Sequence, residues 1–87
     1  MPDKFYVFVP KSAKKSIKKI PLPWQFRIIQ ALSALEVDPY FGERMAGKLQ
    51  GKRKIRIWPY RIIYQIDSKK KIVMIAEIGH RGGVSYK

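Results

Sequence analysis

Basic residues alternate with apolar ones in the segment from Lys54 to Arg61. Successive side chains of a strand point to opposite faces, so Lys54 and Arg56 share one face. If residues 58 and 59 form a two-residue turn, Arg56 lies directly opposite Arg61 and Lys54 lies opposite Ile63. Like charges across a strand pair are destabilising by up to about 1 kcal/mol, and an anion between them would remove that cost. A guanidinium binds phosphate through two parallel hydrogen bonds, so the pattern predicts a phosphate-binding site.

The same arginines have a simpler interpretation. Both guanidiniums can extend into water, with Glu77 on the next strand partly neutralising one of them. The turn between the strands is also open to two interpretations. Proline is disfavoured at the second central position of a tight turn unless its peptide bond is cis. Either the Trp58-Pro59 bond is cis, or the loop is longer than two residues.

The overall charge favours an anionic partner. Lys and Arg number 19 against six Asp and Glu, which gives a net charge of +13 in 87 residues. Nucleic acid is the commonest partner of so basic a chain, because bound phosphates release counterions. A solvated basic surface and an acidic protein partner are the alternatives. No cysteine is present and His80 is the only histidine, so the residue types for a Cys or His zinc site are missing. No apolar run approaches the length that spans a bilayer, and no membrane association is expected.

The periodicity of the apolar residues predicts an α+β fold in one domain, residues 1–87, with the order β-α-α-β-β-β. Strands are expected at Phe5–Val9, Lys54–Ile57, Tyr60–Asp67 and Ile72–Ile78. Helices are expected from the N-cap Ser12 to Ile20 and from Trp24 to Glu36, with a loop at Val37–Ala46. The helix pair would pack as a hairpin on one face of a small twisted antiparallel sheet.

Alternation divides the strand residues between the two faces of this sheet. The face toward the helices is expected to carry Ile55, Ile57, Tyr60, Ile62, Tyr64, Ile66, Met74, Ala76 and Ile78. The open face is expected to carry Lys54, Arg56, Arg61, Ile63, Gln65, Val73, Ile75 and Glu77. The helix stripes that meet the sheet are Ala13, Ile17 and Ile20, and Ile28, Ala31, Leu32 and Leu35.

In its motifs the chain resembles the RelE/ParE superfamily of toxins, and more closely the RelE-like mRNA interferases. The residues that carry the resemblance are Lys48–Gly51, Arg53–Ile57, Tyr60–Ile66, Ile78–Arg81 and Tyr86-Lys87. The resemblance implies a cytoplasmic type II toxin with an acidic RelB-like antitoxin as partner. It also implies ribosome-dependent cleavage of mRNA in the A site, in which the ribose 2′-OH attacks the adjacent phosphate without a metal or other cofactor.

The resemblance assigns roles to particular residues of this chain. Arg61 and Arg81 would hold the scissile phosphate and stabilise its added charge. Tyr86 would stack on or orient a base, and Lys54, Arg56 or His80 would share the acid and base roles. Where relatives have a glycine and a polar residue this chain has Trp58-Pro59, which makes Trp58 a candidate stacking ring. The residues expected to contact RNA are Lys14, Lys15, Lys18, Lys19, Lys52, Arg53 and Trp58.

Two other functions fit the same fold. A ParE-like toxin binds DNA gyrase and has no nuclease site. A non-catalytic RNA-binding module would keep the basic surface alone. The combination of Lys54, Arg56, Arg61, Arg81 and Tyr86 favours the nuclease, because ParE-like members tend to lack this full set.

Overall fold

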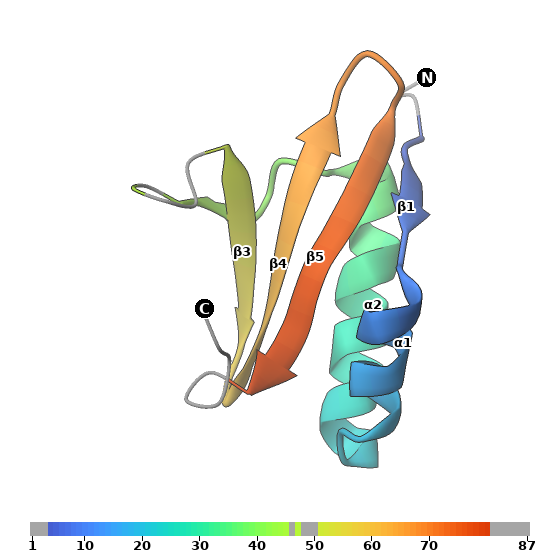
Figure 1. Cartoon of the computed structure of the whole chain (residues 1–87), viewed down its shortest axis with the longest axis vertical. Helices are drawn as coiled ribbons and strands as arrows, with labels where there is room; N and C mark the ends of the chain where they lie inside the picture. The colour runs from blue at the N-terminus through green and yellow to red at the C-terminus, as the bar shows by residue number, and fades with distance from the viewer. Residues whose placement is uncertain (1–3, 46, 48–50, 81–87) are drawn as a thin grey trace.

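The computed structural model describes residues 4–45, 47 and 51–80. Across these residues it has two helices and one five-stranded sheet, with the strand order β1-β5-β4-β3-β2 (Figure 1). The predicted α+β class is confirmed. The elements along the chain are β1 (Tyr6–Phe8), α1 (Lys11–Lys18), α2 (Leu22–Val37), β2 (Glu43–Arg44), β3 (Lys52–Ile57), β4 (Tyr60–Asp67) and β5 (Ile72–His80).

The sheet is mixed. As predicted, β3, β4 and β5 form an antiparallel meander. The first strand β1 is parallel to β5, with Tyr6 beside Ile72 and Phe8 beside Met74. A parallel pair needs a long crossover connection, and the helix pair is part of the chain between these two strands. The other addition is β2, which pairs antiparallel with β3. The prediction of a loop over residues 37–46 is therefore wrong at Glu43–Arg44, which form β2.

Both helices begin earlier than the sequence suggests. The N-cap of α1 is Pro10 instead of Ser12, and α2 begins at Leu22 after the N-cap Pro21. Pro23 lies in the first turn of α2, where a proline is tolerated because its missing N–H would have no intrahelical partner. Neither helix in the described part of the chain is long and apolar enough to cross a membrane.

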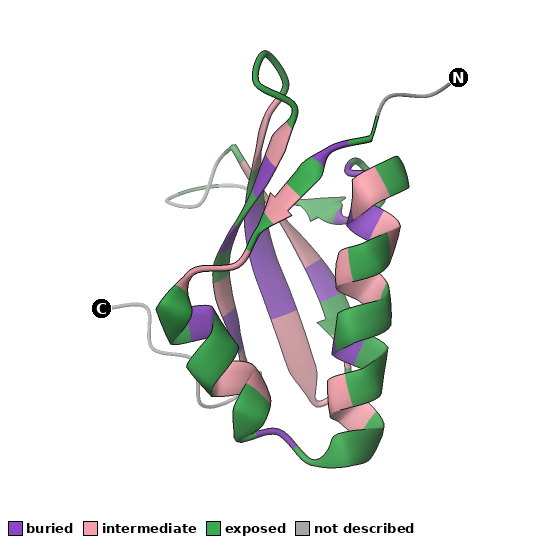
Figure 2. Cartoon of the chain, turned by 90° about the vertical axis from the view of Figure 1, so that its right-hand side faces the viewer, coloured by how far each residue is buried: buried purple, intermediate pink, exposed green. Residues whose placement is uncertain are grey.

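The helices cover one face of the sheet and enclose the core (Figure 2). The predicted helix stripes are confirmed: Ala13, Ile20, Ile28 and Leu35 are buried, and Ile17, Ala31 and Leu32 pack against them. The strand residues that complete the core include Ile55, Ile62, Tyr64 and Ile78.

A bulge in β5 reverses part of the predicted face assignment. Ile63 pairs with Glu77 but Tyr64 pairs with Ile75, so Ala76 is an extra residue on β5. One inserted residue moves every preceding side chain of the strand to the other face. The assignment is therefore wrong for four residues: Val73 and Ile75 are buried in the core, and Met74 and Ala76 are exposed.

Candidate nucleic-acid interface

Three cations gather on the open face of the sheet, away from the helices. Arg56 of β3 is directly opposite Arg61 of β4, and Lys54 is opposite Ile63, as the alternation predicts. We call Arg56 and Arg61 the open-face pair. The Arg56 side chain is 70% exposed and that of Lys54 is 22% exposed. Arg61 is half-buried, with its Nε and Nη2 atoms shielded from solvent. The face thus offers one exposed and two partly enclosed cations to an anion.

The turn that joins β3 and β4 has two residues, and its Trp58-Pro59 peptide bond is cis. The first of the two alternatives from the sequence is therefore correct. The indole Nε1 of Trp24 donates a hydrogen bond of 3.0 Å to the backbone oxygen of Trp58, which ties the turn to α2. The Trp58 residue itself is 68% exposed. An exposed aromatic ring at an anchored turn is suited to stacking on a base.

A carboxylate that the sequence did not suggest lies beside the basic strand β3. Glu43 of β2 is opposite Lys54, and its Oε2 is 3.9 Å from Lys54 Nζ and 3.8 Å from Arg56 Nε. The simpler interpretation of the sequence named Glu77 as the neutralising residue, whereas the ion pairs among the described residues are formed by Glu43. Both contacts are long and the Glu43 side chain itself is 62% exposed, so each contributes only about 0 to 1 kcal/mol. The Glu43 carboxylate can therefore leave these two cations at little cost in stability.

His80 is not brought to the open-face pair. It is opposite Tyr60 at the end of β5, and the two rings meet edge to face with centroids 5.5 Å apart. Tyr60 also meets the ring of Trp24 at 6.2 Å, so these three rings belong to the side of the sheet that faces the helices. The other two candidates, Arg81 and Tyr86, are outside the described residues.

The remaining candidate RNA contacts divide between the two sides. Lys52 is opposite Gln65, two residues before Lys54 and on the same face by alternation. Arg53 points the other way, and its Nη1 donates hydrogen bonds to the backbone oxygens of Tyr40 (3.1 Å) and Gly42 (2.9 Å).

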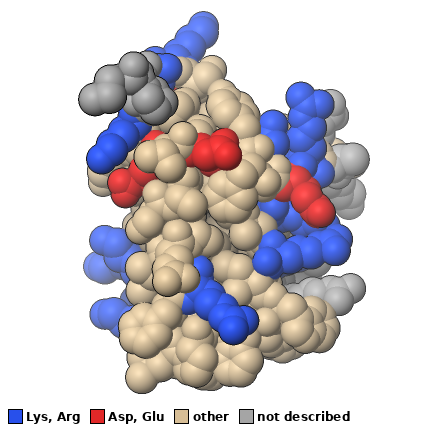
Figure 3. All heavy atoms as spheres, turned by 180° about the vertical axis from the view of Figure 1, so that it is seen from behind, with Lys and Arg blue, Asp and Glu red and all other residues tan. Residues whose placement is uncertain are grey.

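Figure 3 shows the molecule from behind, with Lys and Arg side chains along both edges of the view. The four lysines are exposed on or just after α1: Lys14, Lys15, Lys18 and Lys19. Lys15 and Lys18 also occupy the last turn of α1, where a cation is favourable to the helix dipole whether or not it binds RNA.

A buried tyrosine positions β2 and its carboxylate. The Tyr64 hydroxyl donates a hydrogen bond to the Pro39 backbone oxygen (2.8 Å) and accepts one from the Gly42 N–H (3.0 Å). Burial raises the pKa of Tyr64, so the phenol is neutral. A Cβ on Gly42 would collide with the Tyr64 hydroxyl and the Lys54 backbone oxygen. This contact requires glycine, and it fixes the chain just before Glu43.

The match to a known family agrees with this geometry. Residues 7–84 match the model of the ParE toxin of type II toxin–antitoxin systems, parDE. Since the match covers most of the chain, the chain belongs to this family of type II toxins, within the RelE/ParE superfamily. No curated protein sequence matches the chain.

Solved structures share the fold. A RelBE toxin–antitoxin complex from Mycobacterium tuberculosis has a TM-score of 0.80 at 24% identity, covering 90% of this chain and 99% of that one. The isolated RelE toxin of E. coli has a TM-score of 0.75 at 17% identity, covering 94% and 88%. An archaeal RelE–RelB complex from Pyrococcus horikoshii OT3 has a TM-score of 0.70 at 22% identity, covering 97% and 100%. At these identities the likeness establishes the fold.

Proposed function

We propose that this toxin is a ribosome-dependent endoribonuclease that cleaves mRNA in the ribosomal A site and inhibits translation. The observation that carries the proposal is the open-face pair beside Lys54. Two guanidiniums directly across a strand pair repel each other, and the long, exposed contact of Glu43 with Arg56 (3.8 Å) offsets this repulsion only weakly. A phosphodiester of mRNA supplies an anion for this pair, and the motif resemblance to RelE-like interferases supports the same choice.

The proposed reaction is a transesterification within the RNA and uses no metal ion. The ribose 2′-oxygen attacks the adjacent phosphorus, the bond from phosphorus to the 5′-oxygen breaks, and a 2′,3′-cyclic phosphate and a 5′-hydroxyl form. One group accepts the 2′-hydroxyl proton and another donates a proton to the departing 5′-oxygen. Arg61 stabilises the charge that develops on the phosphoryl oxygens, because donors fixed before the reaction need no reorganisation.

Lys54 is the described open-face residue whose side chain can exchange a proton at this site, and Arg56 beside it cannot. Arginine does not deprotonate in proteins, so it serves as a donor and an electrostatic partner. We assign Arg81 to the phosphate and Tyr86 to the base of the substrate. We assign His80 a structural role on the helix-facing side, where its ring contacts Tyr60 and shapes the end of the sheet.

The second candidate function is inhibition of DNA gyrase without nuclease activity. The family match to ParE toxins favours it. The basic open face is then a protein-binding surface, and Arg61 has no catalytic role. The two candidates differ in the macromolecule that is damaged first in the cell.

The partner in either case is an acidic RelB-like antitoxin in the cytoplasm. The charge of +13 favours an acidic partner. The structures of similar fold from M. tuberculosis and P. horikoshii are toxin–antitoxin complexes.

The test is cleavage of mRNA in a purified translation system. Wild-type protein is expected to cut ribosome-bound mRNA, and Arg61→Ala should lower the rate about 100- to 1,000-fold, the usual effect of removing one such donor. Arg27→Ala is the matched control, since Arg27 is exposed on α2. Intact mRNA together with loss of gyrase supercoiling would establish the second candidate instead. Full cleavage by Arg61→Ala would remove Arg61 from the site.

A further inference from the structure

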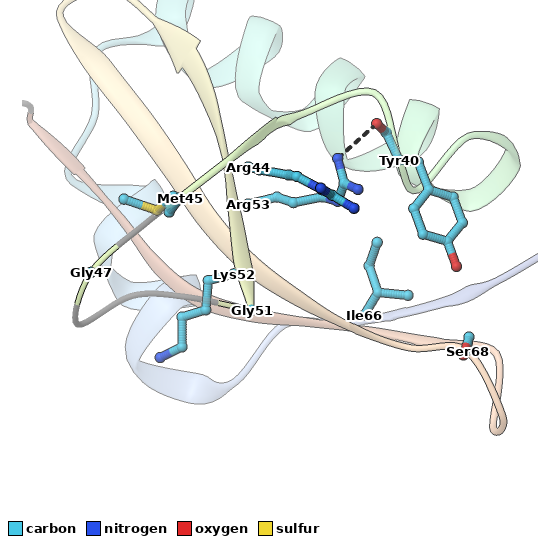
Figure 4. A pocket seen from close by; sticks show the side chains of 9 residues that line it. All are labelled: Tyr40, Arg44, Met45, Gly47, Gly51, Lys52, Arg53, Ile66 and Ser68. Carbon is cyan, nitrogen blue, oxygen red and sulfur yellow. Dashed lines mark hydrogen bonds between the residues drawn. The ribbon is translucent and has the colours of Figure 1, made fainter.

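A second pair of arginines faces each other on the other side of the sheet. Arg44 of β2 is directly opposite Arg53 of β3, and alternation turns both away from Lys54 and Glu43, which form the neighbouring pair. We call Arg44 and Arg53 the cavity pair, because both line an open cavity of about 820 Å³ at this end of the sheet (Figure 4).

The two members of the cavity pair are held differently. Arg53 is fixed by its bonds to the Tyr40 and Gly42 backbone oxygens, and its guanidinium carbon is 5.2 Å from the centre of the Tyr40 ring. Arg44 is exposed. Figure 4 shows the two side chains running side by side toward Tyr40. No described Asp or Glu forms an ion pair with either arginine. The described residues that line the cavity therefore carry two adjacent positive charges and no carboxylate.

The walls around these charges are partly apolar. Ile66, Met45 and the half-exposed Tyr40 line the same cavity, with Lys52 at its margin. The volume is within the range of pockets that hold a drug-sized ligand. An RNA backbone would leave the apolar walls unused, whereas a peptide with acidic and aliphatic side chains uses both kinds of surface. Guanidiniums bind carboxylates in the same two-bond geometry as phosphates.

We propose that this cavity binds an acidic segment of a protein partner. A carboxylate lies between Arg44 and Arg53, and an aliphatic side chain of the segment lies against Ile66. The proposal rests on the acidic-partner part of the proposed function and is independent of the nuclease part. Because the cavity pair and the open-face pair are on opposite sides of the sheet, a segment in the cavity leaves the open-face pair uncovered.

The test uses the full chain and defined probes. A fluorescent synthetic peptide of glutamate and leucine is titrated with the protein, beside a peptide with glutamine for glutamate and one with alanine for leucine. Both altered peptides should bind more weakly. Arg44→Ala should weaken binding of the first peptide about tenfold or more, since a hydrogen bond to a charged group is lost. Arg27→Ala should not, and Arg44→Lys should retain part of the affinity.

Three outcomes would overturn the proposal. Peptide affinity could be unchanged in Arg44→Ala, or could fall only in Arg56→Ala, which would place the peptide on the open face. Alternatively, Arg44→Ala could weaken binding of a single-stranded oligouridylate and leave the peptide unaffected, which would make the cavity an RNA site. The thermal unfolding temperature of Arg44→Ala should equal that of wild type, and this control establishes that the variant is folded. In the absence of peptide, Arg44→Ala should cleave mRNA at the wild-type rate. Failure of the peptide-binding proposal can therefore be told apart from failure of the proposed nuclease function.

Discussion

The two arginine pairs share one geometry in different surroundings. Each places two guanidiniums directly across neighbouring strands. The open-face pair has an exposed carboxylate, Glu43, beside one member. The cavity pair has one member fixed by backbone oxygens and an aromatic ring, with apolar walls around it. The comparison teaches that pairing alone does not define a ligand. The neighbours of each pair favour phosphate on one side and an acidic peptide on the other.

The strongest separation of the two pairs is expected in RNA binding. Replacing both Arg56 and Arg61 with alanine should weaken binding of a single-stranded oligonucleotide about 100-fold, since two charge-assisted hydrogen bonds are lost. The slope of log affinity against log salt should fall by about 1.4, or 0.7 for each phosphate contact. Fluorescence anisotropy at several salt concentrations measures both. An equal loss in Arg44→Ala would mean that the two sides do not differ in ligand.

The loop that supports both pairs is expected to be sensitive to a single methyl group. Gly42→Ala places a Cβ against the Tyr64 hydroxyl and the Lys54 backbone oxygen. Forcing these groups apart should lower the free energy of unfolding by about 3 kcal/mol, because one of them is backbone. Urea denaturation measures the loss. Gly47→Ala is the comparison, since no atom lies near its Cβ position and only its positive φ opposes the change.

Removing the buried hydroxyl should have a somewhat smaller effect. Tyr64→Phe leaves the Gly42 N–H and the Pro39 backbone oxygen without that partner and should cost about 2 kcal/mol at neutral pH. If this loop positions β2, the variant should also weaken binding at the cavity pair more than at the open-face pair. Equal retention of both ligands would show that β2 does not depend on Tyr64.

The same variant gives a pH test. Burial raises the pKa of Tyr64 above the value of about 10 for an unfolded tyrosine. Its stabilising contribution is therefore complete below pH 10 and is lost as pH rises from there through the folded pKa. The stability difference between wild type and Tyr64→Phe should be constant from pH 6 to about pH 9 and shrink above about pH 10. A difference that grows with pH would contradict the neutral buried phenol.

The smallest effect is expected at the carboxylate that distinguishes the open-face pair. Glu43→Gln should change stability by no more than about 1 kcal/mol, because its ion pairs are long and its own carboxylate is exposed. Oligonucleotide binding should tighten a few-fold at low salt, and less at high salt, since a competing anion is removed. Glu36→Gln on α2 is the control. Weaker oligonucleotide binding in Glu43→Gln would show that Glu43 positions the cations instead of competing with the phosphate.

The sequence predicts the bounds of β4 and its pairing with β3, although β3 begins at Lys52, two residues before the predicted start. The opposed Arg56 and Arg61 follow directly from the alternation of apolar and polar residues and from a two-residue turn. The segment 72–76 of β5 is apolar at every position, so alternation there contains no information about the bulge at Ala76. The bulge is set by pairing with β4, which the sequence of β5 alone does not encode.

The missed parts of the site depend on contacts between distant segments. The strand β2 has only two residues, both charged, in a segment with proline and glycine, and no local strand signal marks it. Unless β2 is predicted, the sequence cannot place Glu43 beside Lys54 or Arg44 opposite Arg53. In the sequence Arg53 stands among basic residues and resembles an ordinary surface arginine. Only its hydrogen bonds to the backbone oxygens of residues 40 and 42 show that its side chain is anchored. His80 is on the helix-facing side because it continues the alternation of β5 after Ile78.

The parallel pairing of β1 with β5 bears on how the chain is made. Among the described elements, β1 is synthesised first, yet its partner in the sheet, β5, is synthesised last. Until then the nascent chain lacks Val73, Ile75 and Ile78 of the core, and contacts distant in sequence form slowly. The complete sheet therefore forms only after translation has passed residue 80. This domain can therefore complete its fold only after β5 has left the ribosome.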